Sequence, residues 1–215
     1  MSWHYSVAKF VVGAVLRPAT GWRVWGRDLV PRSGGLLVAS NHISFWDPPL
    51  IGAILPREVH FLAKDELFSN AVFGAMIRSF NALPIRRGMV DLSGMARAVE
   101  TLRGGGAVLL FPEGTRMRDG QLHPARPGVG MMAVNAGVPV VPCYISGSNR
   151  PRRWLLRRQR VRVSFGTPLT WQDLAGPQTD LTPGRALYQR VSDAVMREIA
   201  RLRAEQADRA SRGAA

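Results

Sequence analysis

The stretch Ala107-Val108-Leu109-Leu110-Phe111-Pro112-Glu113-Gly114-Thr115-Arg116 joins five apolar residues to a short polar block. Residues 36–47 follow the same plan, because an apolar run leads into a block that contains His42 and Asp47. A strand that is apolar throughout is buried on both faces, as in a parallel sheet covered by helices. Ligands gather beyond the carboxyl ends of the strands in such sheets, so both polar blocks are candidates for one functional site.

Short apolar runs alternate with longer amphipathic patterns along the chain. The short runs at 36–39, 59–62, 82–85, 107–111, 139–145 and 161–165 predict strands, and the patterns at 48–55, 66–80, 92–102, 129–136 and 187–202 predict helices. This alternation predicts an α/β fold with a mostly parallel or mixed sheet flanked by helices. Pro84, Pro139 and Pro142 fall within predicted strands. Because proline cannot donate to a ladder, we expect those strands to lie at an edge, begin late or carry a bulge.

Length and composition bound the architecture. With 215 residues, 46% of them apolar, the chain is long enough for one domain with a substantial core. We expect an N-terminal membrane-interface segment at 1–30, a main domain at 31–205 and a flexible tail at 206–215. Cys143 is the only cysteine, which excludes an internal disulfide and favours a reducing, cytoplasmic setting. The four histidines are scattered without zinc-ligand spacing, so we expect no metal.

The formal net charge is +14, and nearly all of the positive charge is arginine, since Lys9 and Lys64 are the only lysines. This balance indicates polyanionic partners: nucleic acid, anionic lipid headgroups or an acidic carrier protein. Arginine binds phosphate with two parallel hydrogen bonds, where lysine offers a point charge. Codon bias in a GC-rich genome would give the same excess, so charge alone does not choose among these partners.

Two basic segments, residues 3–27 and 150–162, contain tryptophan among positively charged side chains, a mixture that is typical of membrane interfaces. The apolar run at 7–16 is interrupted by Lys9 and is too short to span a bilayer, which takes about 20 apolar residues. The alternatives are a helix docked on the core for the first segment and a solvated basic loop for the second. The predicted membrane contacts are Trp3, Trp22, Trp25, Arg152, Arg153, Trp154, Arg157 and Arg158.

His42 is the candidate general base of the first block, because an imidazole takes up a proton near neutral pH. Residues five apart on a helix are rotated by about 140°, so a pair between His42 and Asp47 requires a loop between them. Asp47-Pro48 is typical of an N-cap followed by the first helical residue, which leaves 42–46 free to curl back. The alternative is that Asp47 only caps the helix. Ser44 is not a candidate nucleophile, since no G-x-S-x-G elbow surrounds it.

Glu113, Gly114 and Arg116 are the candidate binding residues of the second block. Glycine permits a tight turn at the end of the strand. Arg116 could then bind a phosphate with two hydrogen bonds, and Glu113 could hold that arginine or an acceptor hydroxyl. The alternative is a solvent-exposed turn with a surface ion pair, worth at most about 1 kcal/mol.

The two polar blocks together resemble two motifs of the glycerolipid acyltransferase family of lysophosphatidic acid acyltransferases. The blocks are Asn41-His42-x-Ser44-x-x-Asp47 and Phe111-Pro112-Glu113-Gly114-Thr115-Arg116. The blocks at 81–87 and 138–142 resemble the second and fourth motifs of that family, in the same order along the chain. The resemblance covers about half of the chain, from 36 to 147.

The resemblance implies an α/β acyltransferase domain of the glycerol-3-phosphate acyltransferase-like type, held on the cytoplasmic face of the cell membrane by monotopic or peripheral contact. It also implies transfer of a fatty acyl group from acyl-coenzyme A or acyl carrier protein, with no other cofactor. The acceptor would be the hydroxyl of a lysophospholipid, above all 1-acylglycerol-3-phosphate. His42 would be the base and Asp47 its partner. The residues that would place the acceptor are Arg87, Glu113, Gly114, Thr115 and Arg116.

Three alternatives stay open. The acceptor could be another lysolipid, such as a lyso-aminolipid or lysophosphatidylglycerol, because Asn81 stands where the family more usually has glycine and Met117 where a serine often follows the arginine. Water could replace the lipid hydroxyl at His42, which would make the protein a thioesterase. A basic nucleic-acid-binding protein would explain the charge but leave both blocks unused. No recognisable nucleic-acid motif accompanies the arginines, so we expect no nucleic-acid partner.

Overall fold

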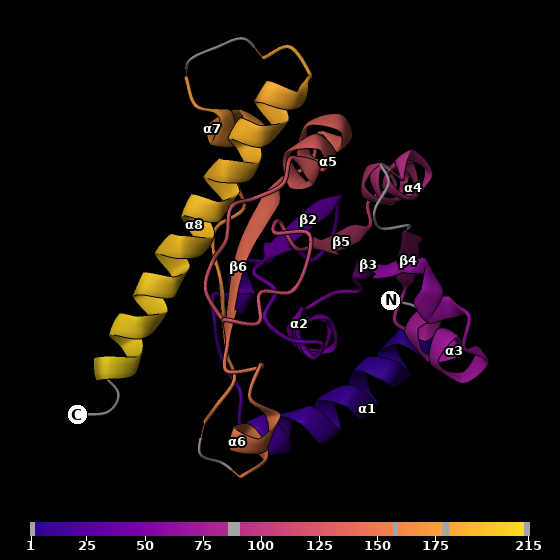
Figure 1. Cartoon of the computed structure of the whole chain (residues 1–215), viewed down its shortest axis with the longest axis vertical. Coiled ribbons are helices and arrows are strands. Elements are labelled where there is room, and N and C mark those ends of the chain that lie inside the picture. Colours follow the sequence, from indigo (N-terminus) through magenta and orange to yellow (C-terminus); the bar gives the residue numbers. More distant parts are fainter. Residues whose placement is uncertain (1–2, 86–90, 157–158, 178–180, 213–215) are drawn as a thin grey trace.

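A mixed sheet lies at the centre of the computed structural model, which describes residues 3–85, 91–156, 159–177 and 181–212 (Figure 1). Within these residues seven strands run in the order β1-β7-β6-β2-β5-β3-β4. Neighbours from β6 to β4 are parallel, whereas β7 is antiparallel to β6 and parallel to β1. The predicted α/β fold is therefore confirmed. The strands are β1 (Arg23–Trp25), β2 (Leu36–Ser40), β3 (His60–Lys64), β4 (Ala82–Ile85), β5 (Ala107–Leu110), β6 (Val140–Ser146) and β7 (Arg162–Phe165).

Helices flank the sheet on both faces (Figure 1). The α-helices of the described residues are α1 (Trp3–Thr20), α2 (Asp47–Ile54), α3 (Ala71–Ser79), α4 (Leu92–Arg103), α5 (Gly128–Ala136), α6 (Pro151–Leu155), α7 (Trp171–Ala175) and α8 (Arg185–Arg212). Two 3-10 turns, η1 (Arg27–Leu29) and η2 (Asp65–Phe68), complete the described elements.

Alternate side chains of β2 point into two hydrophobic cores, one on each face of the sheet. Leu37 and Ala39 join the core under α4, α5 and α8. Leu36 and Val38 join the core under α1 and α2. Because successive side chains of a strand point to opposite faces, the apolar run in this strand supplies both cores. Each fully buried leucine or valine contributes about 1.5–3 kcal/mol, so the strand that leads to the first polar block is firmly held.

The prolines in the predicted strands occupy the tolerated positions that the sequence leads us to expect. Pro84 lies in β4, an edge strand of the sheet, and Pro139 immediately precedes the first residue of β6. Pro84 therefore lies in a strand that is paired on one side only, and Pro139 lies just outside β6, so neither proline interrupts a strand that is paired on both sides.

Pro142 lies inside β6, opposite an irregular stretch of the chain. Cys143 pairs with Phe165 and Val140 pairs with Leu169, so three positions separate the residues on β6 whereas four separate their partners. One extra residue on one side of an antiparallel pair is a β-bulge. The bulge falls where the proline has no N–H to donate, as expected.

The structure corrects the predicted elements in four places. The predicted helix at 66–80 is two elements, η2 and α3, separated by Ser69 and Asn70. The short strand β1 and the five-residue helices α6 and α7 were not predicted. These elements are too short to show a hydrophobic period, and β1 depends on its pairing with β7, far along the chain.

The helix α1 packs one side on the core and leaves the other exposed. The Tyr5 hydroxyl accepts a hydrogen bond from the backbone N–H of Val59 at 3.3 Å, and the Lys9 ammonium donates to the carbonyl of Leu55. On the outer side, Phe10 is 75% exposed. The predicted alternative of a helix docked on the core is therefore confirmed for one side of α1. None of the helices described here has the length and apolarity needed to cross a membrane.

Candidate active site

His42 and Asp47 are brought together by a loop between β2 and α2. The Nδ1 atom of His42 lies 2.9 Å from Oδ2 of Asp47, and both side chains are buried. The same carboxylate oxygen accepts the backbone N–H groups of Ile43 and Ser44, each at 2.7 Å. The loop thus curls back around the carboxylate, as the sequence predicts.

The prediction that Asp47 is the N-cap of the helix is wrong. Trp46 is the N-cap, and Asp47 is the first helical residue, with its carboxylate turned back toward the preceding loop. The reason is competition for the carboxylate. The amides of Ile43 and Ser44 and the imidazole of His42 occupy Oδ2, so it is not available to the first turn of α2. The positive end of the helix still favours the negative charge at this position.

The geometry assigns the roles of the two imidazole nitrogens of His42. Because a carboxylate is an acceptor, Nδ1 carries the proton and donates to Asp47, which leaves Nε2 as the proton acceptor. The ring of Phe111, from the second block, stacks on the imidazole with centroids 3.9 Å apart. The imidazole is therefore fixed by a hydrogen bond at its edge and by an aromatic ring on its face.

Glu113 connects the two polar blocks. Its Oε2 accepts the backbone N–H of His42 at 2.9 Å and its Oε1 accepts that of His123 at 3.3 Å. The side chain is buried, and this burial raises the pKa of the carboxyl group, while the two N–H donors lower it in part. The backbone carbonyl of His42 also accepts the N–H of Met117 at 2.7 Å. The second block therefore holds the backbone of the proposed base in place.

The remaining residues of the second block form the exposed rim of the site. Gly114 has a φ of 73°, in the left-handed region that favours glycine, and Gly114 and Thr115 are exposed. The guanidinium carbon of Arg116 lies 3.2 Å from the ring centroid of Phe45, a cation–π contact. Phe45 is itself 70% exposed, so this pair sits at the mouth of the site. Arg87 lies outside the described residues.

Two positioning residues were not predicted from the sequence. The Ser148 hydroxyl donates to Oδ1 of Asp47 at 2.5 Å, and both side chains are 0% exposed. Asn41 exchanges two hydrogen bonds with the backbone of Ile145, at 3.0 and 2.8 Å, and ties the loop to β6. Asn41 stands in the first motif and could have been singled out there. No sequence pattern relates Ser148 to Asp47, which is 101 positions away.

The predicted membrane contacts divide into exposed and buried side chains. Trp3 is 69% exposed, and Arg152 and Arg153 are also exposed. The prediction for Trp154 is wrong, because it is 3% exposed and packs edge-on against Trp46 with centroids 5.9 Å apart. Trp22 and Trp25 are half-buried, and Arg157 and Arg158 lie outside the described residues.

A buried carboxylate that orients an imidazole beyond the end of a parallel strand, with an arginine at the mouth, defines a class of α/β enzymes that activate a hydroxyl or water for attack. Known proteins narrow that class. The model of the Acyltransferase family matches residues 21–146, more than half of the chain. The chain belongs to this family, and the protein is an acyltransferase, as the two sequence motifs predict.

Individual relatives agree with this assignment. The chain is 27% identical over 172 residues to the 1-acyl-sn-glycerol-3-phosphate acyltransferase of Bacillus subtilis, covering 80% of this chain and 85% of that one. It is 38% identical over 117 residues to the lyso-ornithine lipid O-acyltransferase of Pseudomonas aeruginosa, covering 54% and 44%. The fold is similar to the crystal structure of the 1-acyl-sn-glycerophosphate acyltransferase from Thermotoga maritima, with a TM-score of 0.67, 26% identity and coverage of 95% and 84%.

Proposed function

We propose that the protein transfers a fatty acyl group from acyl-coenzyme A or acyl carrier protein to the free hydroxyl of 1-acylglycerol-3-phosphate, giving phosphatidic acid. The observation that carries this proposal is the 2.9 Å contact between His42 Nδ1 and Asp47 Oδ2 in the loop beyond β2. Relatives named 1-acyl-sn-glycerol-3-phosphate acyltransferase in Bacillus subtilis and Streptococcus pneumoniae support this acceptor. The donor is a co-substrate, and the proposed reaction needs no other cofactor because a thioester is already activated.

The proposed reaction is one direct displacement. Nε2 of His42 takes the proton of the acceptor hydroxyl while the hydroxyl oxygen attacks the thioester carbonyl carbon. The tetrahedral intermediate then collapses, the C–S bond breaks, and the thiolate takes the proton back from the imidazolium. Asp47 stabilises the imidazolium in between, because its buried carboxylate lies against Nδ1. No acyl group is attached to the enzyme at any stage.

Arg116 is the proposed contact for the phosphate of the acceptor. It lies at the mouth of the site over Phe45, close in sequence to the turn at Gly114 and Thr115. A guanidinium binds a phosphate monoester with two hydrogen bonds. Arg87 is proposed as a second phosphate contact from its position in the second motif alone. Glu113 acts differently from its predicted role, because its carboxylate oxygens are directed at backbone amides of the site.

The exposed side of α1 is the proposed membrane contact. We define the α1 stripe as the exposed apolar residues Trp3, Val7, Phe10, Val11 and Val15. These positions recur at helical spacing, and an amphipathic helix of this kind lies in the headgroup layer with its apolar side toward the acyl chains. A negatively charged cytoplasmic leaflet would attract the net charge of +14. We therefore propose attachment to the cytoplasmic face by monotopic or peripheral contact.

A second acceptor is favoured by one observation. The relative from Pseudomonas aeruginosa is a lyso-ornithine lipid O-acyltransferase, and its identity to this chain is 38% over 117 residues. The test is thiol release from palmitoyl-coenzyme A or palmitoyl-acyl carrier protein with each lysolipid added separately, with the lipid product identified by mass spectrometry. Preference for lysophosphatidic acid supports the proposal, and preference for lyso-ornithine lipid assigns the second acceptor. Thiol release that no lysolipid increases would indicate a thioesterase.

A further inference from the structure

Each of the two polar blocks supplies an aromatic ring that stacks on a polar side chain of the other block. Phe111 of the second block stacks on the imidazole of His42, with centroids 3.9 Å apart. Phe45 of the first block lies against the guanidinium of Arg116, whose central carbon is 3.2 Å from the ring centroid. The proposed base and the proposed phosphate contact are therefore held in the same way, each by a ring from the other block.

The contact between Phe45 and Arg116 uses the face of the guanidinium. A nitrogen of this group lies about 1.3 Å from the central carbon. If the group stood on its edge with that carbon 3.2 Å from the ring centroid, a nitrogen would come within about 2.5 Å of the ring, closer than non-bonded atoms approach. The two planes are therefore stacked. Because a phosphate binds along the edge of a guanidinium, Arg116 can rest on Phe45 and bind a phosphate at the same time.

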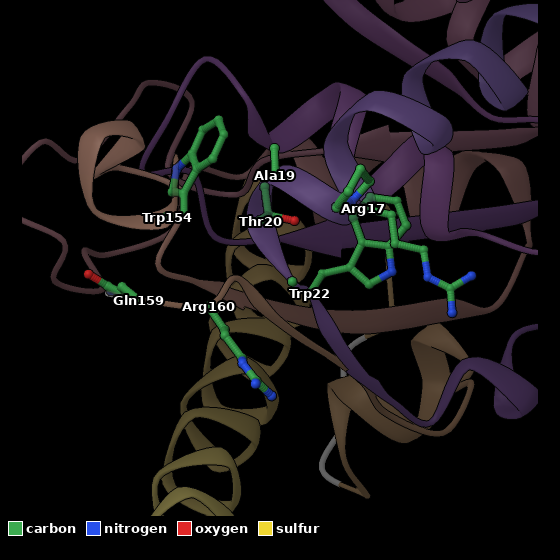
Figure 2. Close-up of a pocket in the computed structure, with 9 residues that line it drawn as sticks. Arg17, Ala19, Thr20, Trp22, Trp154, Gln159 and Arg160 are labelled. Carbon is green, nitrogen blue, oxygen red and sulfur yellow. The ribbon is translucent and has the colours of Figure 1, made fainter. Parts of the chain in front are cut away.

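The backbone on both sides of Phe45 is fixed. Before it, the N–H of Ser44 donates to the carboxylate of Asp47 at 2.7 Å. After it, the N–H of Trp46 donates to the Ser44 hydroxyl at 3.2 Å, and the indole of Trp46 packs edge-on against Trp154. Trp154 is buried where α6 meets the carboxyl end of α1 (Figure 2). Phe45 itself is exposed, so its ring projects from a fixed backbone to the surface.

The backbone beside Arg116 is fixed as well, and its long side chain is what needs support. The N–H of Met117 donates to the carbonyl of His42 at 2.7 Å, which ties the end of the second block to the first. An arginine side chain has many rotamers, and ordering it opposes ligand binding. The ring of Phe45 favours one orientation of the guanidinium before a phosphate arrives, so less of this cost falls on binding.

We propose that Phe45 is a positioning residue for the acceptor, because its ring holds the Arg116 guanidinium in the orientation that binds the acceptor phosphate. The proposal rests on the function proposed above, in which Arg116 binds that phosphate, and it adds a residue of the first block to phosphate recognition. In 1-acylglycerol-3-phosphate the attacking hydroxyl and the phosphate are on neighbouring carbons. The same pair of loops, joined by the two stacked rings, therefore places the groups that bind both ends of this short unit.

Removing the ring should weaken acceptor binding and leave the chemical step intact. A cation–π contact at an exposed site corresponds to about a two- to fivefold preference for the stacked orientation. When the binding-competent orientation is less populated, the apparent Kd rises by the same factor. Phe45→Leu should therefore raise the Kd and KM for the acceptor by about two- to fivefold. The kcat should not change, because His42 keeps its contacts with Asp47 and Phe111.

The first test measures binding of 1-octanoylglycerol-3-phosphate below its micelle concentration by calorimetry, without an acyl donor. We expect weaker binding by Phe45→Leu and wild-type binding by Phe45→Trp, because tryptophan gives the strongest cation–π contacts. The matched control is Phe68→Leu, since the ring of Phe68 in η2 also lies against an arginine, Arg78, at 5.2 Å and outside both polar blocks. Equal Kd values for wild type and Phe45→Leu, an equal loss in Phe68→Leu or Phe45→Trp, or no saturable binding by wild type would overturn the proposal.

The second test asks whether Phe45 acts through Arg116. In a double-mutant cycle, Phe45→Leu should weaken binding in the wild-type background and add nothing to Arg116→Gln, because the guanidinium that the ring holds is then absent. The same additional loss in the Arg116→Gln background would contradict a positioning role. Neither binding measurement needs turnover, so failure of the proposed acyl transfer would show separately, as absent thiol release by the wild type in detergent micelles.

Discussion

Replacing Ser148 with alanine should impair catalysis although Ser148 does not contact a reacting atom. Its hydroxyl donates to Oδ1 of Asp47 at 2.5 Å, and both side chains are 0% exposed, so this hydrogen bond is shielded from bulk solvent. Loss of a hydrogen bond to a charged group costs about 1.5–3 kcal/mol. If the whole cost falls on the transition state, in which Asp47 stabilises the imidazolium, kcat/KM falls by about 10- to 150-fold.

The assay is lysophosphatidic acid-dependent thiol release from palmitoyl-coenzyme A, followed as kcat and KM for wild type and Ser148→Ala. The loss should fall on kcat, because the serine acts through the base and does not touch the acceptor. Ser192→Ala is the matched control, since Ser192 is also 0% exposed and bonds to the backbone of Gly130, away from the site. Both variants should lose stability in urea, and only Ser148→Ala should lose kcat. Equal kcat values for the two variants would refute the reasoning.

Three further predictions follow from the geometry. Asp47→Asn should lower kcat by about 10³–10⁴-fold with the fold retained in circular dichroism, because the amide is neutral and no longer stabilises the imidazolium of His42; a kcat near that of wild type would contradict this. Gly26→Ala should destabilise more than Gly137→Ala in urea unfolding, because both have positive φ but only at Gly26 would a Cβ lie 2.2 Å from the backbone carbonyl oxygen of Phe165; equal losses would exclude the clash. Burial raises the pKa of the Cys143 thiol to about 12 from an ordinary 9.0, so the folded protein disfavours the thiolate. Stability should therefore fall as the pH rises above about 9, and Ellman's reagent should label the folded protein at pH 8 no faster than it unfolds; rapid labelling would contradict burial.

The sequence predicts those parts of the fold in which a local pattern and a tertiary requirement agree. The apolar runs at β2 and β5 indicate buried strands because both faces of these strands contribute to a core. The same reasoning fails for β1, whose three residues include an exposed arginine and which is a strand because it pairs with β7. Trp154 was predicted to contact membrane, since arginines surround it in sequence, yet it is buried against Trp46.

In the candidate site, too, the sequence predicts the local features and misses those that depend on tertiary contacts. The loop between His42 and Asp47 was predicted from the spacing of the two residues and the following proline. The buried position of Glu113 was not predicted, because its partners are the backbone amides of His42 and His123. Almost every residue has a backbone amide, so the sequence does not indicate which amides bind a given carboxylate. Ser148 was missed for a related reason: a single hydroxyl on a loop after β6 carries no period or spacing that points to Asp47.

The proposed reaction depends on His42 removing the proton of a lysolipid hydroxyl. The most direct measurement compares thiol release from palmitoyl-coenzyme A with and without lysophosphatidic acid, for wild type and His42→Ala, with phosphatidic acid quantified in the same samples. We expect release that depends on the lysolipid, equals the phosphatidic acid formed and is lost in the folded variant. Lysolipid-dependent formation of phosphatidic acid by His42→Ala at the wild-type rate would contradict it.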